Sequence, residues 1–207
     1  MTTALEELAR TASTCTRCRL SAGRTQVVFA DGAPDADLMF IGEGPGYHED
    51  VQGLPFVGAA GQLLNRLLGE VGMRREDVRI TNTVLCRPPG NRDPLPDELA
   101  SCRPYLLRQV ELVEPRVVVT LGNFATRVIL DRQVAISKVR GQRHAWNGRV
   151  VIPTFHPAAV LRSGGDSSRT MQSVREDFRE IRTALDELPA VPTAPAVAVP
   201  EEQLGLF

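Results

Sequence analysis

Apolar residues in this chain follow two alternating patterns, one typical of buried strands and one typical of amphipathic helices. The unbroken apolar run at residues 38–41 is typical of a parallel strand covered on both faces, and residues 116–121 (RVVVTL) predict another buried strand. Leucines spaced three and four apart predict a helix over residues 61–71, which Gly72 ends. The expected strands are residues 26–29, 38–41, 78–84, 116–121 and 149–155, with a turn at 30–34. The expected helices are residues 4–10, 61–71, 124–130 and 168–188, together with one that begins at Pro96 and presents an apolar face as far as Val113.

Strands and helices alternate along the chain, which predicts an α/β domain. We expect a mostly parallel sheet of about four main strands with helices on both faces. Residues 1–188 form this domain. Residues 189–200 are rich in proline and alanine, so residues 189–207 are expected to be a flexible tail.

The strand at 38–41 runs directly into a glycine-rich loop, Gly42 to Gly46, that cannot continue a strand. Open α/β sheets bind their ligands at this end of the strands. The loop matches neither GxGxxG nor the phosphate loop GxxxxGK(S/T), so by itself it is consistent with a site or with a structural turn. Glu43 and His156 follow two of the expected strands, and Asn82 lies near the end of a third, just after Thr81. The topology therefore brings an acid, an amide and an imidazole to one edge near Phe56.

Composition narrows the class of protein. The chain has 207 residues, is 43% hydrophobic and carries a net charge of −1, which gives no overall sign of a nucleic-acid binder. Neither a membrane-spanning run nor a secretory signal is apparent, so a soluble cytoplasmic protein is expected. Residues 132–149 are basic and residues 176–207 acidic, a pattern consistent with a polyanion-binding face or with an ordinary solvated surface.

The four cysteines are candidate metal ligands. Disulfides are not expected in a cytosolic chain, and a CxxC pair suits two adjacent ligands of a tetrahedral centre. The four are Cys15, Cys18, Cys86 and Cys102. Their spacing does not separate zinc from an iron–sulfur cluster, and a set of buried thiols with a redox CxxC is the alternative.

Several long motifs follow one another in a recognisable order. They are the paired Cys15 and Cys18, GEGPGxxED from Gly42, GLPFVGxAGQLL from Gly53, TNxVxCRPPxNRxP from Thr81, Cys102, KVRGQ from Lys138 and HPAxxLR from His156. Together they resemble the family 4 uracil-DNA glycosylases, the iron–sulfur members of that superfamily. The resemblance implies a three-layer αβα sandwich, a 4Fe-4S cluster on the four cysteines and excision of uracil from DNA, the first step of base excision repair. Tyr47 and His48 stand where family members often carry acids, which makes His48 a candidate for a minor role.

The chemistry of uracil excision assigns roles to the matching residues. Breaking the bond between C1′ of deoxyribose and N1 of uracil leaves negative charge on the base, so the site must stabilise an anion and present a water to the sugar. The base must first leave the stack. We expect Phe56 to stack on the flipped base, Asn82 to pair with O4 and N3–H of uracil while rejecting cytosine, and His156 to donate to O2.

Further donors and carboxylates come from the glycine-rich loop. Main-chain N–H groups of Gly42, Glu43 and Gly44 are expected to contact uracil. Gly44 lies where family 1 enzymes, by resemblance, hold a water-activating aspartate, so the carboxylates at hand are Glu43 and Glu49. We expect Glu49 to position the water or the loop, and the catalytic set to be these two acids with His156.

Contacts with DNA are expected from the HPAxxLR turn. Val160 and Leu161 are predicted to be exposed and to wedge into the gap left by the flipped nucleotide, while Arg140 and Arg162 hold phosphates. One relative binds uracil covalently through a histidine in a basic insert. Residues 87–101 contain neither histidine nor insert, which favours a turnover enzyme. The cluster is expected to be structural.

The end of the chain carries a candidate partner motif. Gln203, Leu204, Leu206 and Phe207 resemble the QLxLF peptide that binds the bacterial sliding clamp, and a disordered end with stray apolar residues is the alternative. We expect a bacterial, cytoplasmic monomer that associates with the nucleoid when it acts on uracil-containing DNA, single- or double-stranded, and that binds no membrane.

Two other functions are consistent with parts of this pattern. A non-catalytic iron–sulfur protein that binds uracil or DNA would use the same Asn82 and Phe56, so only base release separates it from a glycosylase. A metal-dependent nucleotide hydrolase is disfavoured because the sequence has no cluster of Asp and His ligands near the expected pocket.

Overall fold

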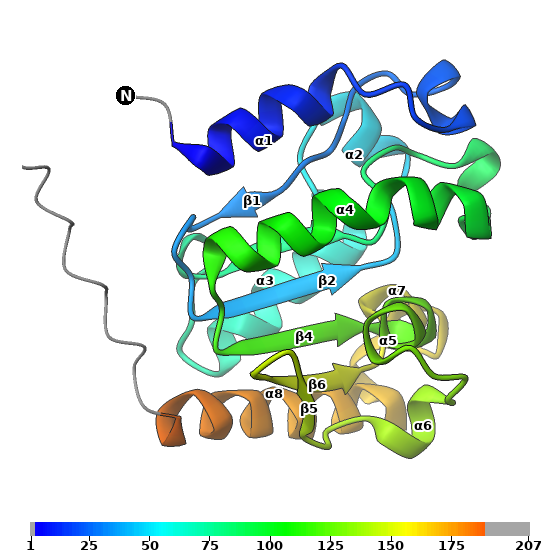
Figure 1. Cartoon of the computed structure of the whole chain (residues 1–207). Helices are drawn as coiled ribbons and strands as arrows, with labels where there is room; N and C mark the ends of the chain where they lie inside the picture. The colour runs from blue at the N-terminus through cyan, green and yellow to red at the C-terminus, as the bar shows by residue number, and fades with distance from the viewer. Residues whose placement is uncertain (1–2, 189–207) are drawn as a thin grey trace, which may run out of the picture.

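A six-stranded sheet forms the centre of the protein in a computed structural model that describes residues 3–188 (Figure 1). The strand order is β1-β3-β2-β4-β6-β5. The four inner strands are parallel, and both edge strands are antiparallel to their neighbours. The strands are β1 (Asp31–Gly32), β2 (Leu38–Gly42), β3 (Arg79–Asn82), β4 (Val117–Leu121), β5 (His144–Trp146) and β6 (Arg149–Thr154).

Helices cover both faces of the sheet because successive strand residues point to opposite sides. On one face, Phe40 and its neighbours pack against α3 (Ala59–Glu70), α7 (Pro157–Arg162) and α8 (Arg169–Glu187). On the other face, Met39 and Val118 pack against α4 (Pro96–Val113) and α5 (Gly122–Leu130). Helix α1 (Ala4–Ser13) lies outside α4 (Figure 1). The predicted three-layer αβα fold is confirmed.

Most of the expected elements are present close to their predicted bounds. Thr3 and Glu6 form the predicted capping box of α1, in which the Thr3 N–H donates to Glu6 at 2.6 Å. The predicted helix at 61–71 is α3, and α4 begins at Pro96 as expected. The remaining short helices are α2 (Tyr47–Gln52) and α6 (Ile136–Val139), with single 3₁₀ turns at residues 19–22, 75–77, 89–91 and 165–167. Among residues 3–188, none of the helices has the length and hydrophobicity to span a bilayer.

The edges of the sheet differ from the prediction. Residues 26–29 form no strand, and they make a single backbone contact across to the segment after β3, from Val28 N–H to the Leu85 carbonyl (2.8 Å). The edge strand β1 instead lies within the expected turn at 30–34. At the other edge, β5 forms an unpredicted hairpin with β6 through Asn147 and Gly148, whose φ angles are 46° and 75°. An Asn-Gly pair with two positive φ values is a strong hairpin signal.

Candidate active site

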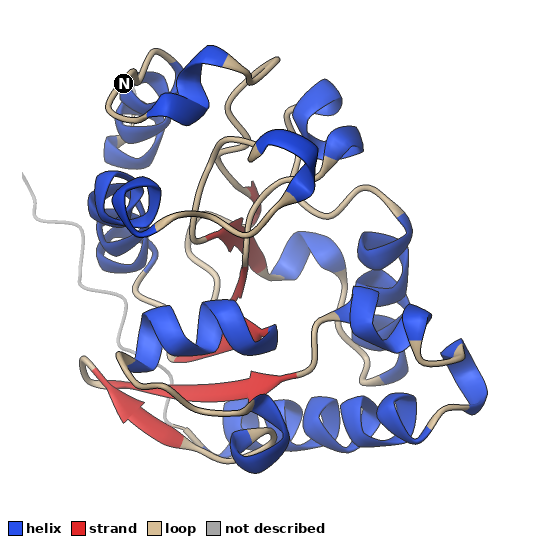
Figure 2. Ribbon diagram, turned by 90° about the vertical axis from the view of Figure 1, so that its right-hand side faces the viewer, coloured by secondary structure: helices blue, strands red, loops and turns tan. Residues whose placement is uncertain are grey.

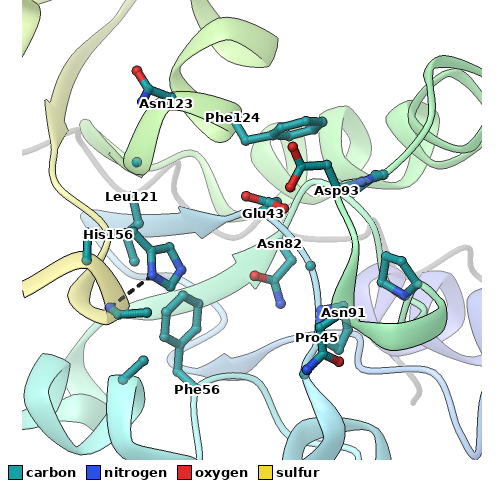
Figure 3. Close-up of a pocket in the computed structure, with 18 of the residues that line it drawn as sticks. Glu43, Pro45, Phe56, Asn82, Asn91, Asp93, Leu121, Asn123, Phe124 and His156 are labelled. Carbon is teal, nitrogen blue, oxygen red and sulfur yellow. Dashed lines mark hydrogen bonds between the residues drawn. The ribbon is translucent and has the colours of Figure 1, made fainter. Parts of the chain in front are cut away.

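The carboxyl ends of the parallel strands open onto one large cavity. Figure 2 views the molecule from the side toward which the parallel strands point. The cavity has a volume of about 790 Å³ and is lined by residues that follow β2, β3, β4 and β6. This volume is in the range of small-molecule sites. The predicted meeting of Glu43, Asn82, Phe56 and His156 at one edge of the sheet is confirmed (Figure 3).

Asn82 is the last residue of β3 and its side chain is buried. Its register partner on β2 is Gly42. Among residues 3–188, no group donates a hydrogen bond to the Oδ1 atom of Asn82, although that atom is shielded from water. An unpaired buried amide oxygen costs roughly 1–3 kcal/mol, so it marks an acceptor that is available to a ligand.

Phe56 forms the flat wall of the cavity, and its backbone is strained to do so. Its φ angle is +53°, which is uncommon for an aromatic residue. Arg75 holds this conformation by donating to the carbonyls of Pro55 (2.6 Å) and Phe56 (3.2 Å). A side chain at Gly61 would collide with the Phe56 carbonyl, which shows that α3 packs directly against the backbone of this turn.

Gly42 allows Phe56 and Asn82 to approach each other. A Cβ atom at this glycine would lie 2.4 Å from Asn82 Oδ1 and 2.6 Å from the Phe56 ring. Both distances are shorter than any ordinary contact. Gly42 therefore acts on the cavity through the positions of Asn82 and Phe56, whereas Glu43 and Gly44 line the cavity directly.

His156 caps α7 and lies beside Phe56 on the wall of the cavity. Its ring stacks on that of Phe56 with the centroids 5.6 Å apart. The N–H of Ala158 donates to Nδ1 of His156 at 3.1 Å, so in the neutral ring the proton is carried by Nε2. Burial lowers the pKa of His156 to about 4, assisted by Arg162 and opposed by Glu49. The imidazole is therefore a neutral donor at pH 7.

The two carboxylates of the loop have different surroundings. Glu49 accepts three backbone N–H bonds, from Gly46 (3.2 Å), Val57 (3.0 Å) and Gly58 (3.0 Å), and so ties the glycine-rich loop to the segment that carries Phe56. Within residues 3–188, no backbone N–H donates to the Glu43 carboxylate, and burial followed by the nearby Asp93 raises the pKa of Glu43 to about 7. Glu43 can therefore exchange a proton near neutral pH, whereas Glu49 holds the loop.

Several cavity residues were not predicted from the sequence. Asn91 and Asp93 line one wall from the loop between β3 and α4, and Asn123 and Phe124 line another from the start of α5 (Figure 3). Asn123 and Phe124 follow the end of β4, a strand end that the same topological rule covers. Asp93 faces Glu43 from 50 residues along the chain, and no local pattern reveals it. His48 is not among the lining residues.

The prediction that Val160 is exposed is wrong. Val160 is completely buried in the core beneath α7, so it cannot insert into DNA. Leu161 is 42% exposed, and Arg162 is exposed and lines the cavity. Neighbouring residues of a helix point in different directions, and only one of this apolar pair faces outward.

The basic segment at 132–149 pairs with acids of the same chain. Arg140 binds the buried carboxylate of Asp177 at 2.7 Å and also contacts Glu176. Arg143 bonds to Glu180 and Glu187. These contacts lock the loop after α6 onto α8, and they hold Arg140 away from the cavity residues. Acids of α8 therefore neutralise two of the five basic residues in this segment.

The four cysteines surround a second, much smaller cavity that shares no lining residue with the first. Two of the sulfurs already accept hydrogen bonds, Cys86 from Arg24 (3.4 Å) and Cys102 from the N–H of Leu85 (3.3 Å). Burial raises the pKa of the Cys102 thiol to about 12. Among residues 3–188, no three or more His, Cys, Asp or Glu side chains lie close enough together to ligate one metal ion as the side chains stand. The candidate clamp peptide, Gln203 to Phe207, lies outside the described residues.

Comparisons with known proteins agree with this geometry. A family model described as the uracil DNA glycosylase superfamily matches residues 29–179. A type-4 uracil-DNA glycosylase of Thermotoga maritima is 48% identical over 171 residues, which cover 82% of this chain and 88% of that protein. A type-4 enzyme of Sulfurisphaera tokodaii is 42% identical over 187 residues, covering 86% and 83%. A type-5 uracil-DNA glycosylase of Thermus thermophilus is 29% identical over 170 residues, covering 72% and 74%. The chain therefore belongs to the uracil-DNA glycosylase superfamily and, within it, to the type-4 (family 4) uracil-DNA glycosylases.

Proposed function

We propose that this protein hydrolyses the N-glycosidic bond between uracil and deoxyribose in DNA and leaves an abasic site for base excision repair. The observation that carries the proposal is the buried, unpaired amide oxygen of Asn82 at the base of the cavity. Membership of the family supports the same activity.

Asn82 and Phe56 select the base. The Asn82 Oδ1 atom accepts the N3–H of uracil, and the amide nitrogen donates to O4. Cytosine presents an amino group and an unprotonated N3 at these positions, so both contacts become repulsive. The Phe56 ring, already stacked on His156, provides a flat surface for the flipped base.

His156 stabilises the leaving group. Since Nδ1 accepts from Ala158, the Nε2–H is free to donate to O2 of uracil as charge develops there. Because the pKa of His156 is low, the imidazole does not take up a second proton at pH 7 and remains a neutral donor. Main-chain N–H groups of Glu43 and Gly44 add donors along the same wall.

Glu43 accepts the proton of the attacking water. It lines the cavity beside Asn82, and its pKa of about 7 suits a general base. Glu49 has its oxygens occupied by backbone N–H groups, and it supports catalysis by holding Phe56 in place. On the DNA side, the exposed Leu161 fills the space left by the base and Arg162 contacts a phosphate.

Base release from an oligonucleotide with a single uracil tests this activity. We expect free uracil and an alkali-labile site from the uracil strand, and neither from matched strands that carry cytosine or thymine. Tight binding to the uracil strand without any free uracil would instead support the non-catalytic binding protein.

We also propose that Cys15, Cys18, Cys86 and Cys102 hold a 4Fe-4S cluster with a structural role. Four thiols around one cavity, two of them accepting N–H bonds, are a suitable donor set for such a cluster. Iron, sulfide and zinc analysis of protein purified without air tests this. Four irons per chain are expected, and one zinc with no iron would contradict the proposal.

A third proposal concerns the tail. Gln203, Leu204, Leu206 and Phe207 form an apolar peptide with a polar anchor, and the preceding linker is long enough to reach a hydrophobic groove on a sliding clamp. Deletion of residues 203–207 should abolish binding to the purified clamp and leave uracil release unchanged. Unchanged clamp binding after the deletion would refute this interaction.

A further inference from the structure

Asp93 and Glu43 come from different loops and face each other at the cavity. Glu43 follows β2, and Asp93 lies on the loop that leads into α4. Both line the main cavity, and Figure 3 displays their carboxyl groups side by side, beneath the ring of Phe124. Glu43 and Asp93 are close enough for the charge of one carboxylate to act on the other.

The backbone around each carboxyl group is firmly anchored. The Glu43 carbonyl accepts from the Thr83 hydroxyl and from the N–H of Val84 at 3.2 Å, which attaches the loop to the strand beside it. Arg92 donates to the Asp93 carbonyl at 2.8 Å and forms a bidentate ion pair with Glu98.

Glu98 also completes the capping box of α4, so the position of Asp93 is coupled to the start of that helix. The fold therefore fixes the backbone positions from which both carboxyl groups enter the cavity.

Two adjacent carboxyl groups in a partly buried site cannot both be ionised without a large penalty. Burial is the main cause of the raised pKa of Glu43, and the Asp93 carboxylate raises it further. Arg162, on α7, opposes both effects. Arg92 and Arg127 are the other basic groups that line the cavity, and Glu49 and His156 are the other titratable ones. At pH 7 the Glu43 carboxyl group is therefore close to half protonated.

We infer that Asp93 is a positioning residue for hydrolysis, which orients the Glu43 carboxyl group and keeps it basic enough to accept a proton from the attacking water. This inference rests on the proposed function. In the hydrolysis step, the water oxygen bonds to C1′ while the C1′–N1 bond breaks. The electron pair of the broken bond leaves with uracil. One proton of the water passes to Glu43, and Asp93 accepts a hydrogen bond from the protonated acid.

The test compares pH profiles of single-turnover uracil release in the full-length protein. The wild type should lose activity below about pH 7, since protonated Glu43 cannot accept a proton. Asp93→Asn removes the like charge beside Glu43. The acidic limb of the profile, in which the rate falls as the pH falls, should therefore move to lower pH. Its plateau rate at pH 8 should fall by roughly tenfold because a less basic Glu43 is a weaker acceptor.

Asp97→Asn is the matched control, because Asp97 lies four residues further along and pairs with Arg19 at the surface. It should leave both the limb and the plateau unchanged. Glu43→Gln should lose at least about a hundredfold in rate and abolish the limb.

A uniform loss of rate in Asp93→Asn, with the limb in its original place, would overturn the inference while leaving the glycosylase activity intact. A ¹³C titration of the Glu43 carboxyl group, assigned by its absence in Glu43→Gln, gives a second readout that needs no turnover. It should move to lower pH in Asp93→Asn. If the wild type released no uracil, the proposed function would fail, and this titration would still decide whether Asp93 acts on Glu43.

Discussion

Replacing Gly42 with alanine should disable the site without unfolding the protein. The new methyl group would lie 2.4 Å from Asn82 Oδ1 and 2.6 Å and 2.7 Å from two carbons of the Phe56 ring. Ordinary contacts are about 3.5–4.0 Å, so the amide and the ring must each move by roughly 1 Å. These are the two groups that recognise the base, and a displacement of about 1 Å costs roughly a hundredfold in rate.

Gly42→Ala should lose a much smaller fraction of its free energy of unfolding than of its catalytic rate. Overpacking of this kind costs about 1–3 kcal/mol, which is less than the roughly 5–15 kcal/mol that stabilises a typical domain. Each kcal/mol lowers Tm by about 2–4 °C in a protein of this size. Gly42→Ala should therefore melt a few degrees below the wild type and remain folded at 25 °C.

Gly69→Ala provides a matched control within α3. A Cβ atom at Gly69 would meet nothing within 4 Å, and alanine favours a helix by up to about 1 kcal/mol over glycine. The assay is kcat/KM for uracil release, with Tm measured on the same preparations. We expect a drop of about a hundredfold for Gly42→Ala and wild-type activity for Gly69→Ala. Full activity in Gly42→Ala would refute the claim that the missing side chain at position 42 sets the positions of Asn82 and Phe56.

Arg75→Ala should slow uracil release by about tenfold or more, because the turn at Phe56 would lose the donors that hold the positive φ angle of Phe56. The control is Arg74→Ala, which changes an exposed neighbour and should have no effect. Equal rates in single-turnover assays would contradict this role. In ¹⁵N-histidine spectra, His156 should remain neutral and protonated on Nε2 down to about pH 5, since its pKa is held near 4, and a titration near pH 6.5 would be inconsistent with the site described above. Because folding lowers this pKa from 6.5, the stability contributed by His156 is present above pH 6.5 and is lost as the pH falls toward 4. Urea melts of His156→Asn should consequently show a weaker loss of stability over that range than the wild type.

The sequence was most informative where local patterns and topology agree. The apolar runs of β2 and β4 predicted buried parallel strands, and the leucine spacing predicted α3. Asn82 and His156 could be placed together because both follow parallel strands whose carboxyl ends share one edge. The hairpin of β5 and β6 was within reach of the same reasoning, since Asn147 and Gly148 are a typical two-residue turn.

The features that were missed depend on contacts between distant parts of the chain. A count of charges along residues 132–149 cannot reveal that α8 returns its acids to Arg140 and Arg143. Likewise, the adjacent apolar residues Val160 and Leu161 look equivalent until α7 is placed on the sheet, where one faces the core. The partnership of Glu43 with Asp93 follows only from the fold of the loop before α4.

The central claim is that Asn82 and His156 together make uracil a leaving group. Its most direct test is uracil release by the wild type beside Asn82→Ala and His156→Ala, on protein purified without air and with the iron content of each variant measured. We predict alkali-labile product from the wild type and a loss of at least about a hundredfold in both variants. Wild-type rates in either variant would contradict the roles given to these residues, and a wild type that binds uracil-DNA without releasing uracil would contradict the catalytic account as a whole.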